Sequence, residues 1–332
     1  MDRIKYVDIF RGFAILVMVF FHFIDLFGEV NVYTDFPYFI ESVGTFAFTP
    51  PPVLFLSVAG MSSYLLVKRR KSQGFETPEI IRNIVVKYGR YVLISLPFTW
   101  FVFDLQTFLT WNEALQGIGT TIIFLSILYV IRDLETPGTL ALIAGIGTVQ
   151  WQRASILSFF QQLSLPSMLD PAAGFLYQMV FGGWFSVTNL MPFALAGLLT
   201  IKILHEKDSP EKVLGIGAAM TAASLLLNGA GIGGFGFYTR TVLLSLYGSG
   251  TSMIIFYVLH QLWNRGGDWS WLSKFGRMAF PVYIWHFLLI VKPAKMVGLE
   301  NSVSHLGAYP VAFALTAACV IVSVKYFDRT RT

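Results

Sequence analysis

The sequence "DIFRGFAILVMVFFHFID", residues 8–25, decides the fold, because it is almost wholly apolar between its charged ends. A membrane-crossing α-helix needs about 20 consecutive apolar residues to span a hydrocarbon core about 30 Å thick. The apolar run is continuous rather than alternating, so it predicts a spanning helix over 9–27. It holds His22 and is too long for the apolar part of a secretory signal, so we expect it to be retained.

The rest of the chain repeats this composition. Of 332 residues, 55% are hydrophobic and only 13% are charged, against about 25% charged in soluble domains. We predict an all-α, polytopic membrane bundle of about ten spans, forming a single domain over 1–332. The sixth span contains Pro192 and is long enough to be a short re-entrant segment followed by a spanning helix. The predicted ranges are 9–27, 50–67, 82–103, 113–131, 137–151, 172–204, 212–229, 240–263, 276–292 and 308–327.

The basic residues predict the orientation. Cytoplasmic loops of membrane proteins are enriched in Lys and Arg. In a ten-span bundle, all but four of the 24 Lys and Arg residues fall on the face that carries both termini, so this face is predicted to be cytoplasmic. The four exceptions are Arg153, Arg240, Lys292 and Lys295. The net charge of +5 then reflects topology and does not indicate nucleic-acid binding. Loop 26–46 is predicted to lie outside, and the amphipathic segment 151–170 at the membrane interface.

Two simple site types are not expected. Cys319 is the one cysteine, and the five histidines lack metal-ligand spacing, so no metal site is predicted. The sequence "GIGGFG" (231–236) matches a dinucleotide-binding pattern, but it does not follow a strand, so we interpret it as an outside loop.

The first helix carries ionisable residues at both ends. Arg11 and His22 are eleven positions apart, which is three helical turns plus about 20°, so they share a face about 16 Å apart along the axis. Asp8 and Asp25 lie three residues outside this pair, where side chains can meet. Asp25 is predicted to orient His22 as a base. The alternatives are that Arg11 is a snorkelling anchor and that His22 is a buried histidine bonded to backbone.

A ligand with a polyanionic head and a distant reactive group would fit this spacing. Coenzyme A is such a ligand, because Arg and Lys bind its phosphates and its thioester lies at the end of a long, thin arm.

Five stretches of the chain resemble, in order, the transmembrane acyltransferases. The first, "RIKYVDIFRGFAILVMVFFHFIDLFG" (3–28), resembles the opening of the heparan-α-glucosaminide N-acetyltransferase catalytic-domain family and its prokaryotic relatives. It also shares an Arg–ten residues–His spacing with the acyltransferase-3 family. The other similar stretches are "PVLFLSVAGMSSYLLVKRR" (52–70), "EALQGIGTTIIF" (113–124), "NLMPFALAGLL" (189–199) and "FGRMAFPVYIWH" (275–286).

This resemblance implies transfer of an acetyl or other short acyl group from cytoplasmic acyl-CoA to an acceptor across the membrane. The acceptor group is an amine or a hydroxyl. An amino sugar, another glycan and a lipid headgroup are all compatible with the sequence as acceptors. The expected location is a prokaryotic cell membrane. The lysosomal family carries a catalytic His in the outside loop and tends to have Asn at position 22, whereas loop 26–46 here has no His. His22 is therefore predicted to replace that base, by direct transfer or through an acyl-His22 intermediate. A homodimer is compatible with the sequence.

Further candidate residues are assigned by type. His286 is predicted to be catalytic or orienting, with Tyr283 and Asp104 as acceptor contacts. Their alternatives are structural or surface roles. Candidate acetyl-CoA contacts are Arg11, Ser57, Gly60, Ser63, Lys68, Arg69, Arg90, Gln116 and Asn189. For these the alternatives are helix packing, positive-inside charge and helix–helix hydrogen bonding. The alternative function is a proton or anion transporter that uses Arg11, His22, Asp25 and His286, although no internal repeat supports it.

Overall fold

The computed structural model describes residues 4–28, 51–102, 114–132, 135–151, 175–182, 185–207, 209–231 and 242–329. Within these ranges the chain is helical and has no strand, which confirms the all-α prediction. Four predicted features lie wholly or largely outside the described residues. They are loop 26–46, Asp104, the interface segment 151–170 and the "GIGGFG" loop.

Seven helices in the described ranges are long and apolar enough to cross a membrane, which makes the chain an integral multi-pass membrane protein. The seven contain or comprise α1 (Lys5–Phe27), α3 (Pro51–Ser72), α6 (Ala114–Ile131), α10 (Val187–Lys202), α11 (Pro210–Gly229), α12 (Val242–Asn264) and α16 (His305–Arg329). In the seventh span the apolar candidate begins at Gly307.

The predicted count of ten is not confirmed. The three remaining predicted spans correspond to α4, α7 and a helical stretch made of α14, η3 and α15. Their bounds are Thr77–Val102, Thr136–Trp151, Ala279–His286, Phe287–Val291 and Lys292–Met296. The helix α4 is long enough to span a membrane, but Lys87 and Arg90 lower its hydropathy. The helix α7 has only 16 residues and is too short.

Two predicted spans are interrupted in the structure. In the sixth, which contains the π-helix η1 (Gln178–Gly182), Ser186 lies directly before α10 and has an extended backbone (φ −67°, ψ 154°). In the ninth, α13 (Ser270–Arg277) ends at Met278 (φ −92°, ψ 8°), and α14 begins directly after it. Pro192 lies inside α10 and does not end the helix.

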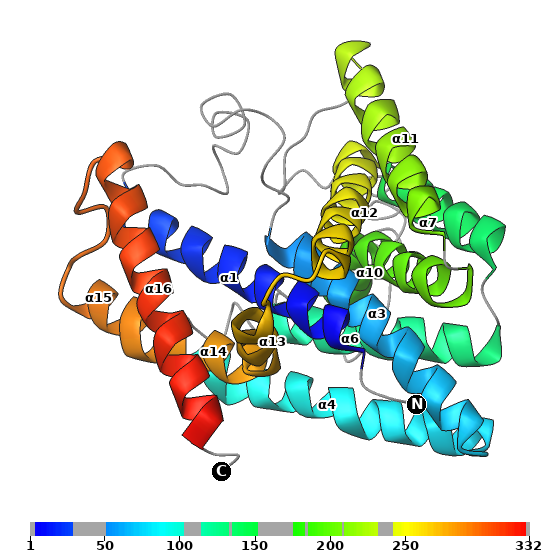
Figure 1. Cartoon of the computed structure of the whole chain (residues 1–332), viewed down its shortest axis with the longest axis horizontal. Helices are drawn as coiled ribbons and strands as arrows, with labels where there is room; N and C mark the ends of the chain where they lie inside the picture. The colour runs from blue at the N-terminus through cyan, green and yellow to red at the C-terminus, as the bar shows by residue number, and fades with distance from the viewer. Residues whose placement is uncertain are drawn as a thin grey trace, which may run out of the picture.

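The helix α10 forms the centre of the bundle. Its spanning window is 94% buried, whereas the windows of α11 and α16 are only 28% and 22% buried. A helix that is apolar all round is expected to be enclosed by other helices. Figure 1 shows α1, α3 and α10 in the middle, with α16 and α11 at opposite sides.

Small residues let α3 and α10 pack backbone against backbone. A Cβ atom on Gly60 would lie 1.9 Å from the carbonyl oxygen of Ala194, and one on Gly197 would lie 1.8 Å from that of Ser57. Such close crossings are typical of membrane helices, where van der Waals packing drives association. No side chain larger than hydrogen fits at either glycine without separating the two helices.

The first part of α1 is packed in the same way against α13. A Cβ atom on Gly12 would lie 2.1 Å from the carbonyl oxygen of Leu272, and one on Gly276 would lie 2.0 Å from that of Asp8. This crossing brings the charged residues of α1 next to the end of α13.

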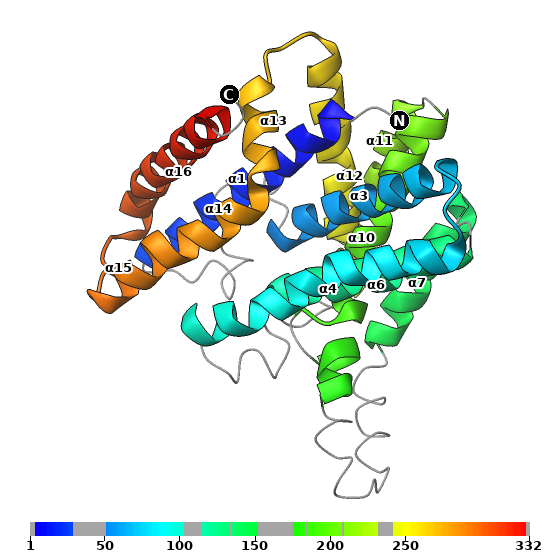
Figure 2. The same cartoon turned by 90° about the horizontal axis from the view of Figure 1, so that it is seen from below.

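The last turn of α1 is held by the segment before α16. The backbone N–H of Asn301 donates to the carbonyl of Leu26 at 3.0 Å, and that of Val303 donates to the carbonyl of Phe27 at 3.0 Å. An isolated bridge also joins Gly28 to Val303. These contacts satisfy carbonyl groups that a helix end otherwise leaves open. Figure 2 shows α1 passing between α16 and α3.

Segments predicted to share the cytoplasmic face do contact one another. Lys274 and Asp328 form an ion pair at 2.8 Å, and Arg277 lies 3.5 Å from Asp8. The N-terminal end of α1, the α13 region and the C-terminal end of α16 therefore lie on one side of the bundle. That this side is cytoplasmic stays a prediction.

Candidate functional site

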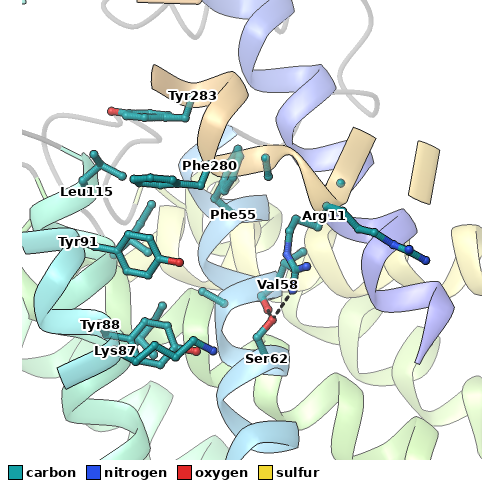
Figure 3. A pocket seen from close by; sticks show the side chains of 16 residues that line it. Arg11, Phe55, Val58, Ser62, Lys87, Tyr88, Tyr91, Leu115, Phe280 and Tyr283 are labelled. Atoms are coloured by element: carbon teal, nitrogen blue, oxygen red, sulfur yellow. Dashed lines mark hydrogen bonds between the residues drawn. The ribbon is translucent and has the colours of Figure 1, made fainter. Parts of the chain in front are cut away.

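A cavity of about 280 Å³ lies between α1, α3, α4, α6, α13 and α14 (Figure 3). Three of the side chains that line it are cationic, namely Arg11, Lys87 and Arg277, and no Asp or Glu of the described residues lines it. The other lining residues are Phe55, Val58, Ala59, Ser62, Tyr88, Tyr91, Leu115, Ile118, Ile122, Gly276, Ala279, Phe280 and Tyr283. The charge balance of the lining favours an anionic ligand.

Arg11 is held from two sides. Its Nη1 donates to Asp8 Oδ1 at 3.0 Å, and its Nη2 donates to the hydroxyl of Ser62 at 2.9 Å. That hydroxyl donates in turn to the carbonyl of Val58 at 2.9 Å, which leaves its lone pairs for the guanidinium. A guanidinium has five N–H donors, and 29% of the Arg11 side chain is exposed. The orientation of Arg11 is thus fixed while donors remain for a ligand.

Asp8 connects Arg11 to Arg277. The carboxylate is buried, and its second oxygen lies 3.5 Å from Nε of Arg277. A buried carboxylate is tolerated when it is paired in this way. One carboxylate therefore faces two guanidinium groups, and Lys87 adds a third cation across the cavity.

The opposite end of the cavity is aromatic. Figure 3 shows Phe280 and Tyr283 at the end away from Lys87, Tyr88 and Ser62. The ring of Phe280 packs against Tyr91 with centroids 5.1 Å apart. The cavity thus runs from a cationic end to an apolar end.

Two imidazoles lie next to the aromatic end. His22 Nδ1 is 2.9 Å from His286 Nε2, and the rings are nearly parallel, at an angle of 8° with centroids 5.1 Å apart. The ring of Tyr283, which lines the cavity, is 5.8 Å from that of His286. His286 is 1% exposed, whereas His22 is partly exposed. His22 is therefore the more exposed member of the pair.

The hydrogen bonds assign the tautomers of this pair when both rings are neutral. Nδ1 of His286 lies 2.9 Å from the carbonyl of Val282, which can only accept, so this nitrogen carries the proton. Nε2 of His286 then has a lone pair and accepts from Nδ1–H of His22. Nε2 of His22 then carries the lone pair of the neutral ring.

The structure gives His22 a partner that the sequence analysis did not pair with it. His286 contacts Nδ1 of His22. Asp25 is partly buried, three residues further along α1, and its predicted role stays a prediction.

Three residues of α3 that were predicted to contact acetyl-CoA, Ser57, Gly60 and Ser63, pack against neighbouring helices. Ser57 is 3.1 Å from the carbonyl of Phe193, Ser63 is hydrogen-bonded to Ser126, and Gly60 forms the crossing with α10. The face of α3 that lines the cavity consists instead of Phe55, Val58, Ala59 and Ser62. The packing alternative therefore describes Ser57, Gly60 and Ser63 in this structure.

Five further candidates are also absent from the described cavity lining. Lys68 pairs with Glu206 at 3.1 Å. Arg69 and Arg90 are exposed, and Gln116 and Asn189 are buried elsewhere.

Lys87 and Arg277 are the cavity cations that were not proposed as ligand contacts from the sequence. The buried residues Ile80, Ile84 and Tyr88 follow a spacing of four and mark the inner face of α4. Arg90 lies about 200° around the helix from Tyr88, whereas Lys87 lies only about 100° from it. This signal was present in the sequence. The position of Arg277 depends on the crossing of α1 and α13, which no local pattern reveals.

The fold and the site define an integral membrane helical bundle in which a cationic cavity ends beside an imidazole pair. The family model described as heparan-alpha-glucosaminide N-acetyltransferase, catalytic, matches residues 3–168, half of the chain, including Arg11, His22 and Lys87. The chain belongs to this family of membrane acetyltransferases. The resemblances at 189–199 and 275–286 lie outside the matched residues. The comparison with curated proteins finds no match.

Proposed function

We propose that this protein transfers an acetyl or other short acyl group from cytoplasmic acyl-CoA to an amine or hydroxyl on the outer side of the membrane. The acceptor is an amino sugar or another glycan. The observation that carries the proposal is that α1 bears both ends of the site. Arg11 lies in the cationic end of the cavity, and His22 lies in the imidazole pair about 16 Å along the same helix.

The donor is held by its phosphates. Arg11, Lys87 and Arg277 supply the charge-assisted hydrogen bonds that phosphate groups favour. The cavity volume of about 280 Å³ lies below the roughly 300–1,000 Å³ of most small-molecule sites, so the cavity takes the narrow arm of the donor. The nucleotide part then remains at the exposed, cationic end.

His22 acts on the acceptor. Its Nε2 removes the proton from the acceptor amine or hydroxyl, which attacks the thioester carbonyl while the carbon–sulfur bond breaks. The coenzyme A thiolate leaves and is protonated. By accepting from Nδ1–H, His286 leaves the lone pair of neutral His22 on Nε2. A positioned base contributes about 10²–10⁴-fold to such a reaction. Trapping an acyl-enzyme from acyl-CoA alone would distinguish a route through acyl-His22 from direct transfer.

Purified protein in lipid vesicles tests this function. With acetyl-CoA and D-glucosamine as probes, we expect release of the coenzyme A thiol together with formation of N-acetylglucosamine. A protein that neither binds acetyl-CoA nor removes its acetyl group, and that behaves identically after His22→Ala, would contradict the enzyme function and favour the transporter.

Lys87 and Arg90 form a matched pair for the donor site, because both are exposed cations on α4 and only Lys87 lines the cavity. Lys87→Ala is expected to raise the Kd for coenzyme A by up to about fivefold, since an exposed ion pair contributes about 0.2–1 kcal/mol. Arg90→Ala is expected to leave this Kd unchanged. Titration calorimetry at constant salt measures both values, and equal effects of the two substitutions would contradict the placement of the phosphates.

A further inference from the structure

Three aromatic side chains form a cluster that reaches from the cavity to the imidazole pair. We call Phe98, Tyr283 and Phe287 the aromatic wall. Their centroids are 5.7 Å apart for Phe98 and Tyr283, 5.8 Å for Phe98 and Phe287, and 5.4 Å for Tyr283 and Phe287. These are ordinary contact distances for packed rings. The three residues are only 6–7% exposed, so the wall is closely packed.

The aromatic wall touches both parts of the site. On one side, Tyr283 lines the cavity, whereas neither His22 nor His286 does. On the other side, Phe287 lies 4.3 Å from the ring of His286 and 4.9 Å from that of His22. An acyl group that moves from the cavity to His22 therefore passes next to these rings.

We propose that the aromatic wall determines the length of the acyl chain that the protein accepts, and restricts the donor to short acyl groups. This inference rests on the proposed function. A longer chain has to displace rings that already pack against each other, and such overpacking costs about 1–3 kcal/mol. One methylene group in an apolar pocket changes specificity by roughly 10- to 200-fold.

The experiment compares acetyl-CoA with hexanoyl-CoA in direct competition, with D-glucosamine as acceptor. The variants are Tyr283→Ala and Phe98→Ala, with Phe98→Leu as a milder change that keeps most of the packing. Phe101→Ala is the matched control, because Phe101 lies on the same helix as Phe98 and is 64% exposed. Equilibrium binding of both donors, which needs no acceptor, is measured in parallel.

Removal of either ring is expected to raise the ratio of kcat/KM for hexanoyl-CoA over acetyl-CoA by about tenfold or more, while Phe101→Ala leaves the ratio as in the unmodified protein. The inference is overturned if the wall variants still transfer acetyl groups with an unaltered ratio, or if the unmodified protein uses both donors equally. If the unmodified protein binds neither donor, the proposed function itself is wrong and this inference falls with it.

Discussion

Replacement of His22 by alanine is expected to lower the rate of acetyl transfer by about 10²–10⁴-fold while the affinity for coenzyme A stays the same. The loss follows from the tautomers of the imidazole pair, which leave Nε2 of His22 as the basic nitrogen. The affinity is retained because Arg11 lies about 16 Å away along α1. Single-turnover rates at saturating acetyl-CoA measure the first quantity, and calorimetry measures the second.

His260 provides the control for this substitution. It lies on α12 and packs edge-on against Tyr6 with ring centroids 5.2 Å apart, away from both the cavity lining and the imidazole pair. His260→Ala is expected to leave transfer intact. The assignment of the base to His22 would be wrong if His22→Ala transferred acetyl groups at the unmodified rate.

Replacement of Arg11 by alanine is expected to raise the Kd for coenzyme A by about 10- to 100-fold, because hydrogen bonds to charged groups contribute about 1.5–3 kcal/mol. The effect should exceed that of Lys87→Ala, since Arg11 is fixed by Asp8 and Ser62 and is less exposed. Binding of pantetheine, which lacks the nucleotide phosphates, should change little.

The substitution of Arg11 also leaves Asp8 with one guanidinium partner fewer. The double variant Asp8→Asn with Arg11→Ala removes this uncompensated charge and should restore stability without restoring affinity. If pantetheine and coenzyme A lose affinity equally, Arg11 acts on the shape of the cavity and not on the phosphates.

The helical character of the bundle could be predicted because continuous apolar runs leave few other structures in a membrane. The interruptions could not be predicted equally well. The break before α10 was suggested by the length of the run. The break at Met278 lies where α13 packs its Gly276 against α1, and Pro281 in the first turn of α14 is the local signal that marks it.

The candidate site divides in the same way. Arg11 and His22 lie on one helix, so their shared face follows from helical periodicity alone. The pairing of His22 with His286 joins residues that are far apart in the sequence. Arg277 lines the cavity because α1 and α13 cross closely at Gly12 and Gly276. Neither contact follows from a local sequence pattern. For Ser57, Gly60 and Ser63 the sequence could not distinguish a ligand contact from helix packing, because small residues suit a ligand groove and a helix contact equally well.

The attachments of α1 make it a fixed frame for any catalytic cycle. Backbone contact with α13 immobilises its first half, and hydrogen bonds from Asn301 and Val303 immobilise its last turn. The distance between phosphate binding and proton removal is then a constant of the protein, and substrates have to adapt to it. Movements that admit donor and acceptor in turn are then expected from surrounding helices such as α4, because α14 carries His286 and has to keep its contact with His22.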